Sequence, residues 1–366
     1  MARIAAGLIC LLLLAGIAAA DELAQSCSDL SPDGQTCCKN TFNLQEENRI
    51  MFAAPTVVDY SESTGNLLVR GPVPVLVREG AGNQKGCKNF ADWKFAYDEL
   101  NTMIKNKKTD APLYFSDAKK AAMVTDLQDF DLKDYHVIII SLLNNGDTNQ
   151  LYFSVEKAAF GGAFSTCSGS PLQQGTLRGT EANLVWSNTI GCPDNNPTCL
   201  HDRMYTNSDN FCGWVDTVQN ITALLTTKDP SGKKRFIYYH CNHGADRTGG
   251  ITIGYLLTAN PTMTLPHAIM YTTYLGRESG SPPWAPDPGA RNIAAAYCKS
   301  IGGLCDMNEG TRVFLPGSDT HSHLPGQEDP VVTPTLSPVT TTVPVPVQTP
   351  VSPGRYIPPG SSEVTF

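Results

Sequence analysis

One stretch of the chain constrains the fold more than any other, because it joins a buried strand to a helix through a short loop. Arg235–Tyr239 is aromatic and β-branched, which is typical of a buried strand. The loop from Cys241 to Gly249 contains glycine, and a helix is predicted to start with Thr248–Thr258. A further helix is predicted before the strand, over Asn210–Thr227. The order helix, strand, loop, helix predicts a layered α/β fold.

Hydrophobic patterns elsewhere predict the remaining elements. Tyr135–Leu143 predicts a strong buried strand. The turn residues 144–147 follow it, so Leu151–Val155 is expected to return as a hairpin partner. Residues 188–210 contain Gly, Pro, Asn and Asp and are interpreted as a long loop. Further strands are expected at 66–69, 73–77 and 182–186, and further helices near 90–105, 265–275 and 290–301.

The two ends of the chain differ in composition from the middle. Residues 1–20 combine Arg3, an apolar stretch and three alanines, which predicts a cleaved signal peptide and a secreted or lumenal protein. An uncleaved anchor is the alternative, but the apolar stretch is short for a membrane span. Residues 21–50 are polar with three cysteines and are expected to form an N-terminal extension. Residues 330–366 are rich in Pro and Thr and are expected to be a disordered tail, leaving 51–315 as the main domain.

The cysteine count has its own consequence. Cleavage of the leader removes Cys10 and leaves 11 of the 12 cysteines, an odd number that predicts one free thiol. We expect Cys241 to be that thiol and the other ten to form disulfides, with Cys192–Cys199 and Cys298–Cys305 as local pairs. A zinc site is the alternative use of the group Cys192, Cys199, His201 and Cys212. The ten cysteines expected to pair are Cys27, Cys37, Cys38, Cys87, Cys167, Cys192, Cys199, Cys212, Cys298 and Cys305.

Charge and hydropathy exclude several classes of partner. The formal net charge is −8 and no basic block is present, which argues against nucleic acid or an anionic membrane surface as the main partner. Beyond the leader no apolar run approaches the ~18 residues of a membrane-spanning helix, so no transmembrane segment is expected. Asn220-Ile221-Thr222 is a glycosylation sequon, consistent with a glycoprotein.

The residues from His240 to Gly249 carry chemistry. A cysteine ends the strand, and six residues later an arginine opens the helix, with Gly244 allowing the loop between them to curl. Such a loop directs backbone N–H groups at one point near the positive end of a helix dipole. Arg247 adds a fork that matches two phosphate oxygens. The same field is expected to lower the pKa of Cys241 and make it a thiolate nucleophile aimed at phosphorus.

This stretch resembles the signature of the cysteine-dependent phosphatase superfamily: His-Cys, five residues of any kind, Arg, Ser or Thr, and Gly. The resemblance covers residues 180–275 and implies a protein-tyrosine-phosphatase-like central sheet flanked by helices, here with disulfides. It implies that Cys241 forms a phosphocysteine, that Arg247 binds phosphate, that Thr248 assists departure of the sulfur and that His240 orients the loop. The residues whose backbone N–H groups would bind phosphate are Asn242, His243, Gly244, Ala245 and Asp246.

The resemblance also implies a general acid, an aspartate about thirty residues before the cysteine. Asp209 lies 32 residues before Cys241 and Asp202 lies 39 before it, and both are candidates. A Ser208-Asp209 helix cap is the structural alternative for Asp209. Asp246 is the third candidate, and its place before Arg247 is similar to that in several phosphoinositide-directed members. No Trp-Pro-Asp triplet occurs, which disfavours the tyrosine-specific subclass.

Together these features predict a secreted or lumenal phosphatase that hydrolyses phosphate monoesters on protein, of the phosphotyrosine or dual-specificity type. The first alternative is a phosphatase of phosphoinositides or inositol phosphates, working by the same chemistry. The second is a secreted surface protein that binds phosphorylated ligands without turnover. Neither a cofactor nor a metal is expected, because the adjacency of His240 and His243 to Cys241 suits a loop better than a tetrahedral shell.

Overall fold

The computed structural model describes residues 55–77, 93–106, 111–144, 147–167, 172–207, 212–278 and 285–306. The chain divides into two units, 1–315 and 316–366, and every described residue lies in the first. The expected signal peptide, N-terminal extension and Pro/Thr-rich tail therefore lie outside the described residues, as does Asp209.

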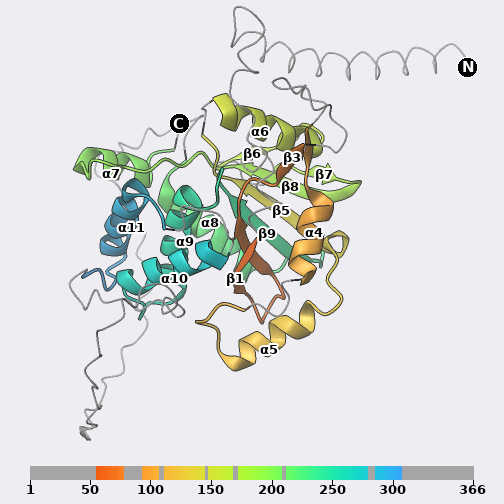
Figure 1. Ribbon diagram of the computed structural model, residues 1–366, viewed down its shortest axis with the longest axis horizontal. Coiled ribbons are helices and arrows are strands. Elements are labelled where there is room, and N and C mark those ends of the chain that lie inside the picture. Colours follow the sequence, from red (N-terminus) through yellow and green to blue (C-terminus); the bar gives the residue numbers. More distant parts are fainter. Residues whose placement is uncertain are drawn as a thin grey trace, which may run out of the picture. The chain divides into compact units, whose positions relative to one another are not determined.

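The described residues form a mixed α/β structure around a central mixed sheet (Figure 1). The strand order is β1-β2-β9-β5-β8-β6, with β7 paired to β8. Neighbours from β2 to β6 run parallel, whereas β1 and β7 are antiparallel to their partners. The strands of this sheet are β1 (Thr56–Tyr60), β2 (Leu67–Gly71), β5 (Tyr135–Ser141), β6 (Ser165–Thr166), β7 (Gly175–Leu177), β8 (Thr180–Trp186) and β9 (Lys234–His240). A separate antiparallel pair is formed by β3 (Val75–Val77) and β4 (Trp93–Phe95).

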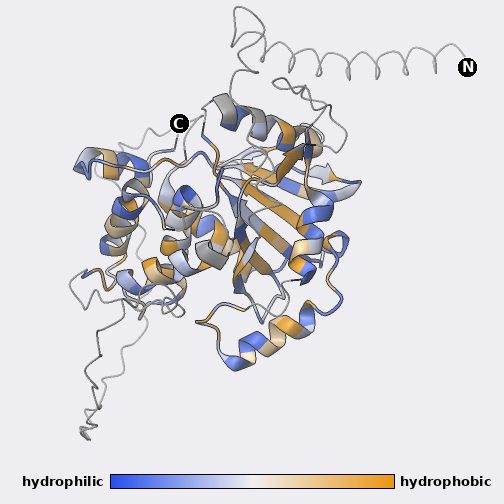
Figure 2. Cartoon of the chain, viewed as in Figure 1, coloured by the Kyte–Doolittle hydropathy of each residue, from blue (hydrophilic) through white to orange (hydrophobic). Residues whose placement is uncertain are grey.

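Helices cover both faces of the sheet, and the strands between them are largely apolar (Figures 1 and 2). On one face, Leu68, Ile140 and Ile237 share a core with α8–α11. On the other face, Val69, Ile139 and Phe236 share a core with α4 and α5. The helices are α4 (Tyr97–Asn106), α5 (Asp117–Asp126), α6 (Asp147–Ala159), α7 (Pro197–Tyr205), α8 (Trp214–Thr226), α9 (Asp246–Ala259), α10 (Leu265–Glu278) and α11 (Pro288–Ser300), with a 3₁₀ turn η3 at Leu132–Asp134.

The three central parallel strands end at the same level. His240 at the end of β9 pairs with Gly71 of β2 on one side and with Ser141 of β5 on the other. Two loop hydrogen bonds continue this pairing: Leu142 N–H donates to the His240 carbonyl at 2.7 Å, and Val73 N–H donates to the Asn242 carbonyl at 3.1 Å. The chain that follows β9 therefore lies at the carboxyl edge of the sheet, where ligand sites of parallel sheets commonly form.

The opposite edge of the sheet contains a buried polar network. Asp229 accepts a hydrogen bond from Arg235 Nε at 2.9 Å, and its carboxylate lies 2.6 Å from His136 Nδ1. His136 Nε2 lies 2.7 Å from Asn183 Oδ1, so the network links β5, β8 and β9. Burial alone would raise the pKa of Asp229, but hydrogen bonds from Ser231 and Arg235 outweigh it and hold that pKa well below its usual range.

The prediction of a hairpin after β5 was wrong. Residues 151–155 belong to helix α6, which starts at Asp147. A hairpin partner needs a free edge beside β5, but β9 and β8 occupy both sides of it in parallel register. Tyr152, Val155 and Glu156 are buried at helical spacing, which the turn signal before them concealed.

The prediction of a continuous loop over residues 188–210 was also wrong, because α7 occupies Pro197–Tyr205. The Asn196 side chain caps this helix by accepting from Thr198 N–H at 2.9 Å, and Pro197 takes the first helical position. Asn-Pro is therefore a helix start here, where a proline loses no hydrogen bond, and not a turn.

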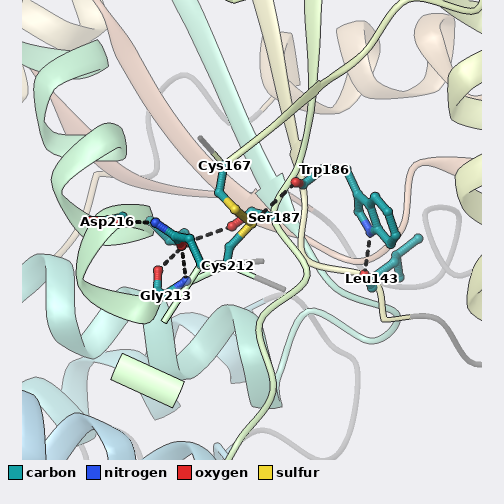
Figure 3. Close-up of a disulfide and its surroundings, with 9 residues drawn as sticks. Leu143, Cys167, Trp186, Ser187, Cys212, Gly213 and Asp216 are labelled. Atoms are coloured by element: carbon teal, nitrogen blue, oxygen red, sulfur yellow. Dashed lines mark hydrogen bonds between the residues drawn. A yellow bond between two sulfur atoms is a disulfide. The ribbon is translucent and has the colours of Figure 1, made fainter. Parts of the chain in front are cut away.

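Three disulfides are formed among the described residues. Cys192–Cys199 and Cys298–Cys305 confirm the predicted local pairs, and Cys167–Cys212 joins the end of β6 to the segment before α8 (Figure 3). Cys241 is the free cysteine of the described part of the chain, as expected. The zinc alternative is excluded, because Cys192, Cys199 and Cys212 are all consumed in disulfides. The bonds are consistent with a non-cytosolic protein.

The segment around Cys167–Cys212 is held by further contacts that Figure 3 shows. Gly213 N–H donates to the Asn207 side chain at 2.6 Å, Ser187 Oγ lies 2.7 Å from Thr217 Oγ1, and Trp186 Nε1 donates to the Leu143 carbonyl at 2.8 Å.

None of the described helices is long and apolar enough to cross a bilayer.

Candidate active site

The strand–loop–helix unit predicted from the sequence is present. Strand β9 ends at His240, and α9 begins at Asp246. Cys241 directly follows the strand and is 2% exposed, with its side chain in the core on the α8–α11 side. His240, one residue earlier, points to the other side, where its ring stacks on Tyr238 at 5.7 Å. The cysteine thus lies at the floor of the loop and not on the surface.

Two opposed effects act on the Cys241 thiol. Burial raises its pKa, but the charge of Arg247 and hydrogen bonding from Thr248 outweigh burial, so the pKa is lowered from its usual value. The Thr248 hydroxyl is buried and forms no well-aligned hydrogen bond within the described part of the chain, so its effect on the thiol depends on its proximity to the sulfur. The negative charge of Asp246 opposes the shift. A thiol in this environment ionises more readily than a free cysteine.

The guanidinium of Arg247 is half-buried at the start of α9. Its Nη1 donates to the Leu142 carbonyl at 2.8 Å, which fixes the group against the end of β5. Its other N–H groups have no acceptor among the described residues, and neither do the backbone N–H groups of Asn242, Gly244 and Ala245. Free donors around a helix N-terminus suit an anion with several oxygens.

Gly244 is the point where the loop bends. Its φ of +78° lies in the left-handed region, and a Cβ there would lie 2.6 Å from backbone atoms of Gly71. Only glycine satisfies both conditions without strain. The close approach joins the loop to the end of β2, and Tyr238 Oη donates to the carbonyl of the next residue, Pro72, at 2.6 Å.

His240 contacts a buried carboxylate that was not predicted. Its Nδ1 lies 3.2 Å from the Cys241 carbonyl, and its Nε2 lies 2.7 Å from Glu156 Oε1 of α6. Both side chains are completely buried. Neither carboxylate oxygen of Glu156 has a well-aligned hydrogen-bond donor among the described residues, so the two side chains are close without a well-formed hydrogen bond. The misassignment of residues 151–155 to a strand concealed Glu156.

Arg70 of β2 is the second residue that the sequence did not reveal. It is 2% exposed, and its Nη2 donates to the Gly244 carbonyl while Nη1 donates to the Thr272 carbonyl of α10 at 3.2 Å. The only available signal was its position in an apolar strand, Leu67–Gly71, where a buried arginine is unusual.

The three aspartates considered as general acid have different environments. Asp202 lies on α7 and not in a loop, with a side chain 61% exposed beside His201. Asp246 is half-buried and accepts from Asp287 N–H at 3.1 Å. Burial and the nearby charge of Asp287 raise the pKa of Asp246. Asp209 falls in the undescribed stretch 208–211, so the acid stays unassigned.

No model of a known protein family matches this chain, and no curated protein sequence matches it. The resemblance to a phosphatase signature therefore depends on the residues from His240 to Gly249 and their surroundings. Among the described residues no group of three or more His, Cys, Asp and Glu side chains is arranged to hold a metal.

Proposed function

We propose that this protein is a cysteine-dependent phosphatase, with a protein-tyrosine-phosphatase-like fold, that hydrolyses phosphate monoesters. The observation that carries the proposal is the free Cys241, buried below the free N–H donors of Asn242, Gly244 and Ala245, with its pKa lowered despite burial. An inert buried cysteine would show the opposite shift. The retention of this one thiol beside three disulfides supports a chemical role for it.

In the proposed reaction, the N–H groups of the loop and the Arg247 fork bind the phosphate oxygens. The Cys241 thiolate attacks phosphorus, and a P–S bond forms as the P–O bond to the leaving group breaks. The leaving oxygen takes the bonding electrons and a proton from a carboxylic acid. Water then attacks the phosphocysteine and gives a proton back to the carboxylate, the P–S bond breaks, and thiolate and inorganic phosphate are released.

The test is hydrolysis of an aromatic phosphate ester by purified protein with its disulfides intact. Cys241→Ser is expected to abolish turnover and keep phosphate binding, because the loop donors remain and the hydroxyl does not ionise. Arg247→Lys keeps the charge but loses the planar fork, so a large loss is expected there as well. Residual turnover above a few per cent in Cys241→Ser would refute a phosphocysteine route.

A panel of substrates distinguishes the possible substrate classes. It contains a phosphotyrosine peptide, a phosphoserine peptide, phosphoinositides and inositol hexakisphosphate. We favour protein substrates, and preferential turnover of the inositol compounds would replace that part of the proposal. Phosphate binding with no turnover of any ester would leave a secreted phospholigand-binding protein as the answer.

A further inference from the structure

Arg70 is a buried cation whose charge is not neutralised by an ion pair with any other described residue. No carboxylate of the described residues lies within ion-pair distance of it, and its hydrogen-bond acceptors are two backbone carbonyls, those of Gly244 and Thr272. A buried charge with only neutral partners is costly unless an anion lies nearby. Arg235, the other buried arginine of the sheet, shows the usual solution, since it is paired with Asp229.

Cys241 lies on the same side of the sheet as Arg70, and its charge acts on the arginine together with that of Tyr239. Arg70 shares a sheet face with Leu68 of its own strand, and this face carries the core that contains Cys241. Its Nη2 bonds the carbonyl of Gly244, inside the loop that starts at Cys241. Burial lowers the pKa of Arg70, while the charges of Tyr239 and Cys241 oppose that shift. Charge coupling is mutual, so a group whose anion stabilises the arginine is itself ionised more easily by it.

We infer that Arg70 is a positioning residue for Cys241, holding the Gly244 carbonyl and supplying from β2 the buried positive charge that compensates the thiolate. Arg70 is too buried to touch a substrate, so it acts through the loop and the sulfur. The inference rests on the proposed function for its purpose, but the charge coupling itself does not require turnover.

Other charged groups also face this thiol, and the test must separate them. Arg247 and Asp246 act from α9, Tyr238 from β9, and the His240–Glu156 pair lies on the other side of the sheet. Tyr114 and Tyr239 lie near Arg70. All of these remain unchanged in an Arg70 variant, so a shift in thiol ionisation there reports the arginine.

The experiment is the pH dependence of iodoacetamide alkylation of Cys241, followed by mass spectrometry of its peptide in unreduced protein. Arg70→Met is expected to raise the apparent thiol pKa, and so to slow alkylation severalfold at pH values below it. Arg70→Lys keeps the charge and is expected to retain most of the wild-type profile. Should Arg70→Met not fold, Arg70→Gln replaces it, since its amide can still donate to one carbonyl.

Arg235→Met is the matched control. It removes a buried arginine from the far end of β9, about 20 Å along the strand from Cys241, and is expected to destabilise the fold without moving the thiol profile. The inference is overturned if neutral Arg70 variants keep the wild-type profile, or if Arg70→Lys moves it as far as they do. If the alkylation profiles of wild type and variants are as expected but the wild-type protein hydrolyses no phosphate ester, the proposed function is refuted and the inference about Arg70 stands.

Discussion

Replacing Gly244 with alanine tests whether the loop is held against the end of β2. Alanine at a φ of +78° costs about 1–2 kcal/mol, the usual penalty of the left-handed region for an L residue. Its Cβ would also lie 2.6 Å from Gly71 backbone atoms and 2.8 Å from Pro72 N, and neither neighbour is a flexible side chain. Overpacking of that kind costs roughly 1–3 kcal/mol. The expected loss is therefore about 2–5 kcal/mol.

Gly232 provides the matched control, because it has a φ of +79° and nothing within 4 Å of its Cβ position. Gly232→Ala is expected to cost only the conformational part, about 1–2 kcal/mol. Both substitutions also reduce the entropy of the unfolded chain by the same amount. The difference between the two variants thus isolates the contact with Gly71 and Pro72, expected at roughly 1–3 kcal/mol.

The free energy of unfolding in urea measures both variants, and alkylation of Cys241 reports the loop. If the loop moves to relieve the clash, the Gly244→Ala variant loses less stability, but the carbonyl at position 244 moves away from Arg70 and the reactivity of the thiol changes. A Gly244→Ala protein as stable as Gly232→Ala, with wild-type alkylation, would refute the close approach.

Further variants test the rest of the structure. Asp229→Asn breaks the buried network with Arg235 and is expected to cost about 3 kcal/mol at pH 7. Because the folded pKa of Asp229 is depressed, the wild-type protein loses this stability advantage over the variant as the pH falls below about 4. Urea unfolding of both proteins from pH 7 to 3 measures the difference in unfolding free energy, and a difference that does not change with pH contradicts the network. Removing the Cys167–Cys212 disulfide, which closes a loop of 45 residues, is expected to lower the free energy of unfolding by about 4 kcal/mol. Removing Cys192–Cys199, which closes a loop of 7 residues, is expected to lower it by about 2 kcal/mol, and equal losses would contradict the loop-entropy account. Asp202→Asn is expected to leave hydrolysis of alkyl and aryl phosphates unchanged, since its exposed side chain faces solvent; a selective loss on alkyl esters would make it the acid.

The parts of the structure that the sequence predicted correctly are those that local signals determine. Strand β9 and helix α9 follow from an apolar run, a glycine-bearing loop and a helical pattern, all within residues 234–259. The pairs Cys192–Cys199 and Cys298–Cys305 were predictable because each closes only seven residues. Cys167 and Cys212 are 45 residues apart, so the sequence did not show that these two cysteines pair with each other.

The errors share a physical cause. Residues 144–147 carry turn chemistry, and a turn after a buried strand normally predicts a hairpin. Whether a hairpin can form depends on the neighbours of β5, and these are β8 and β9, which come 39 and 93 residues after its end. Two parallel neighbours leave no place for a hairpin partner, so the chain leaves β5 through a crossover, which is usually a helix, and that fact is not local.

The same limit applies to the site, and it explains which residues were missed. The motif from His240 to Gly249 supplies the thiol, the donors and the fork, but the buried charged residues that contact it arrive from elsewhere. Arg70 lies 171 residues before Cys241, and Glu156 lies 85 before it, on strands and helices that meet the loop only after the sheet has formed. Pairing of Gly71, His240 and Ser141 at one level brings both groups to the loop. The ionisation of Cys241 is therefore a property of strand register as much as of the motif, and a slip of one residue in β2 would move Arg70 to the other face of the sheet.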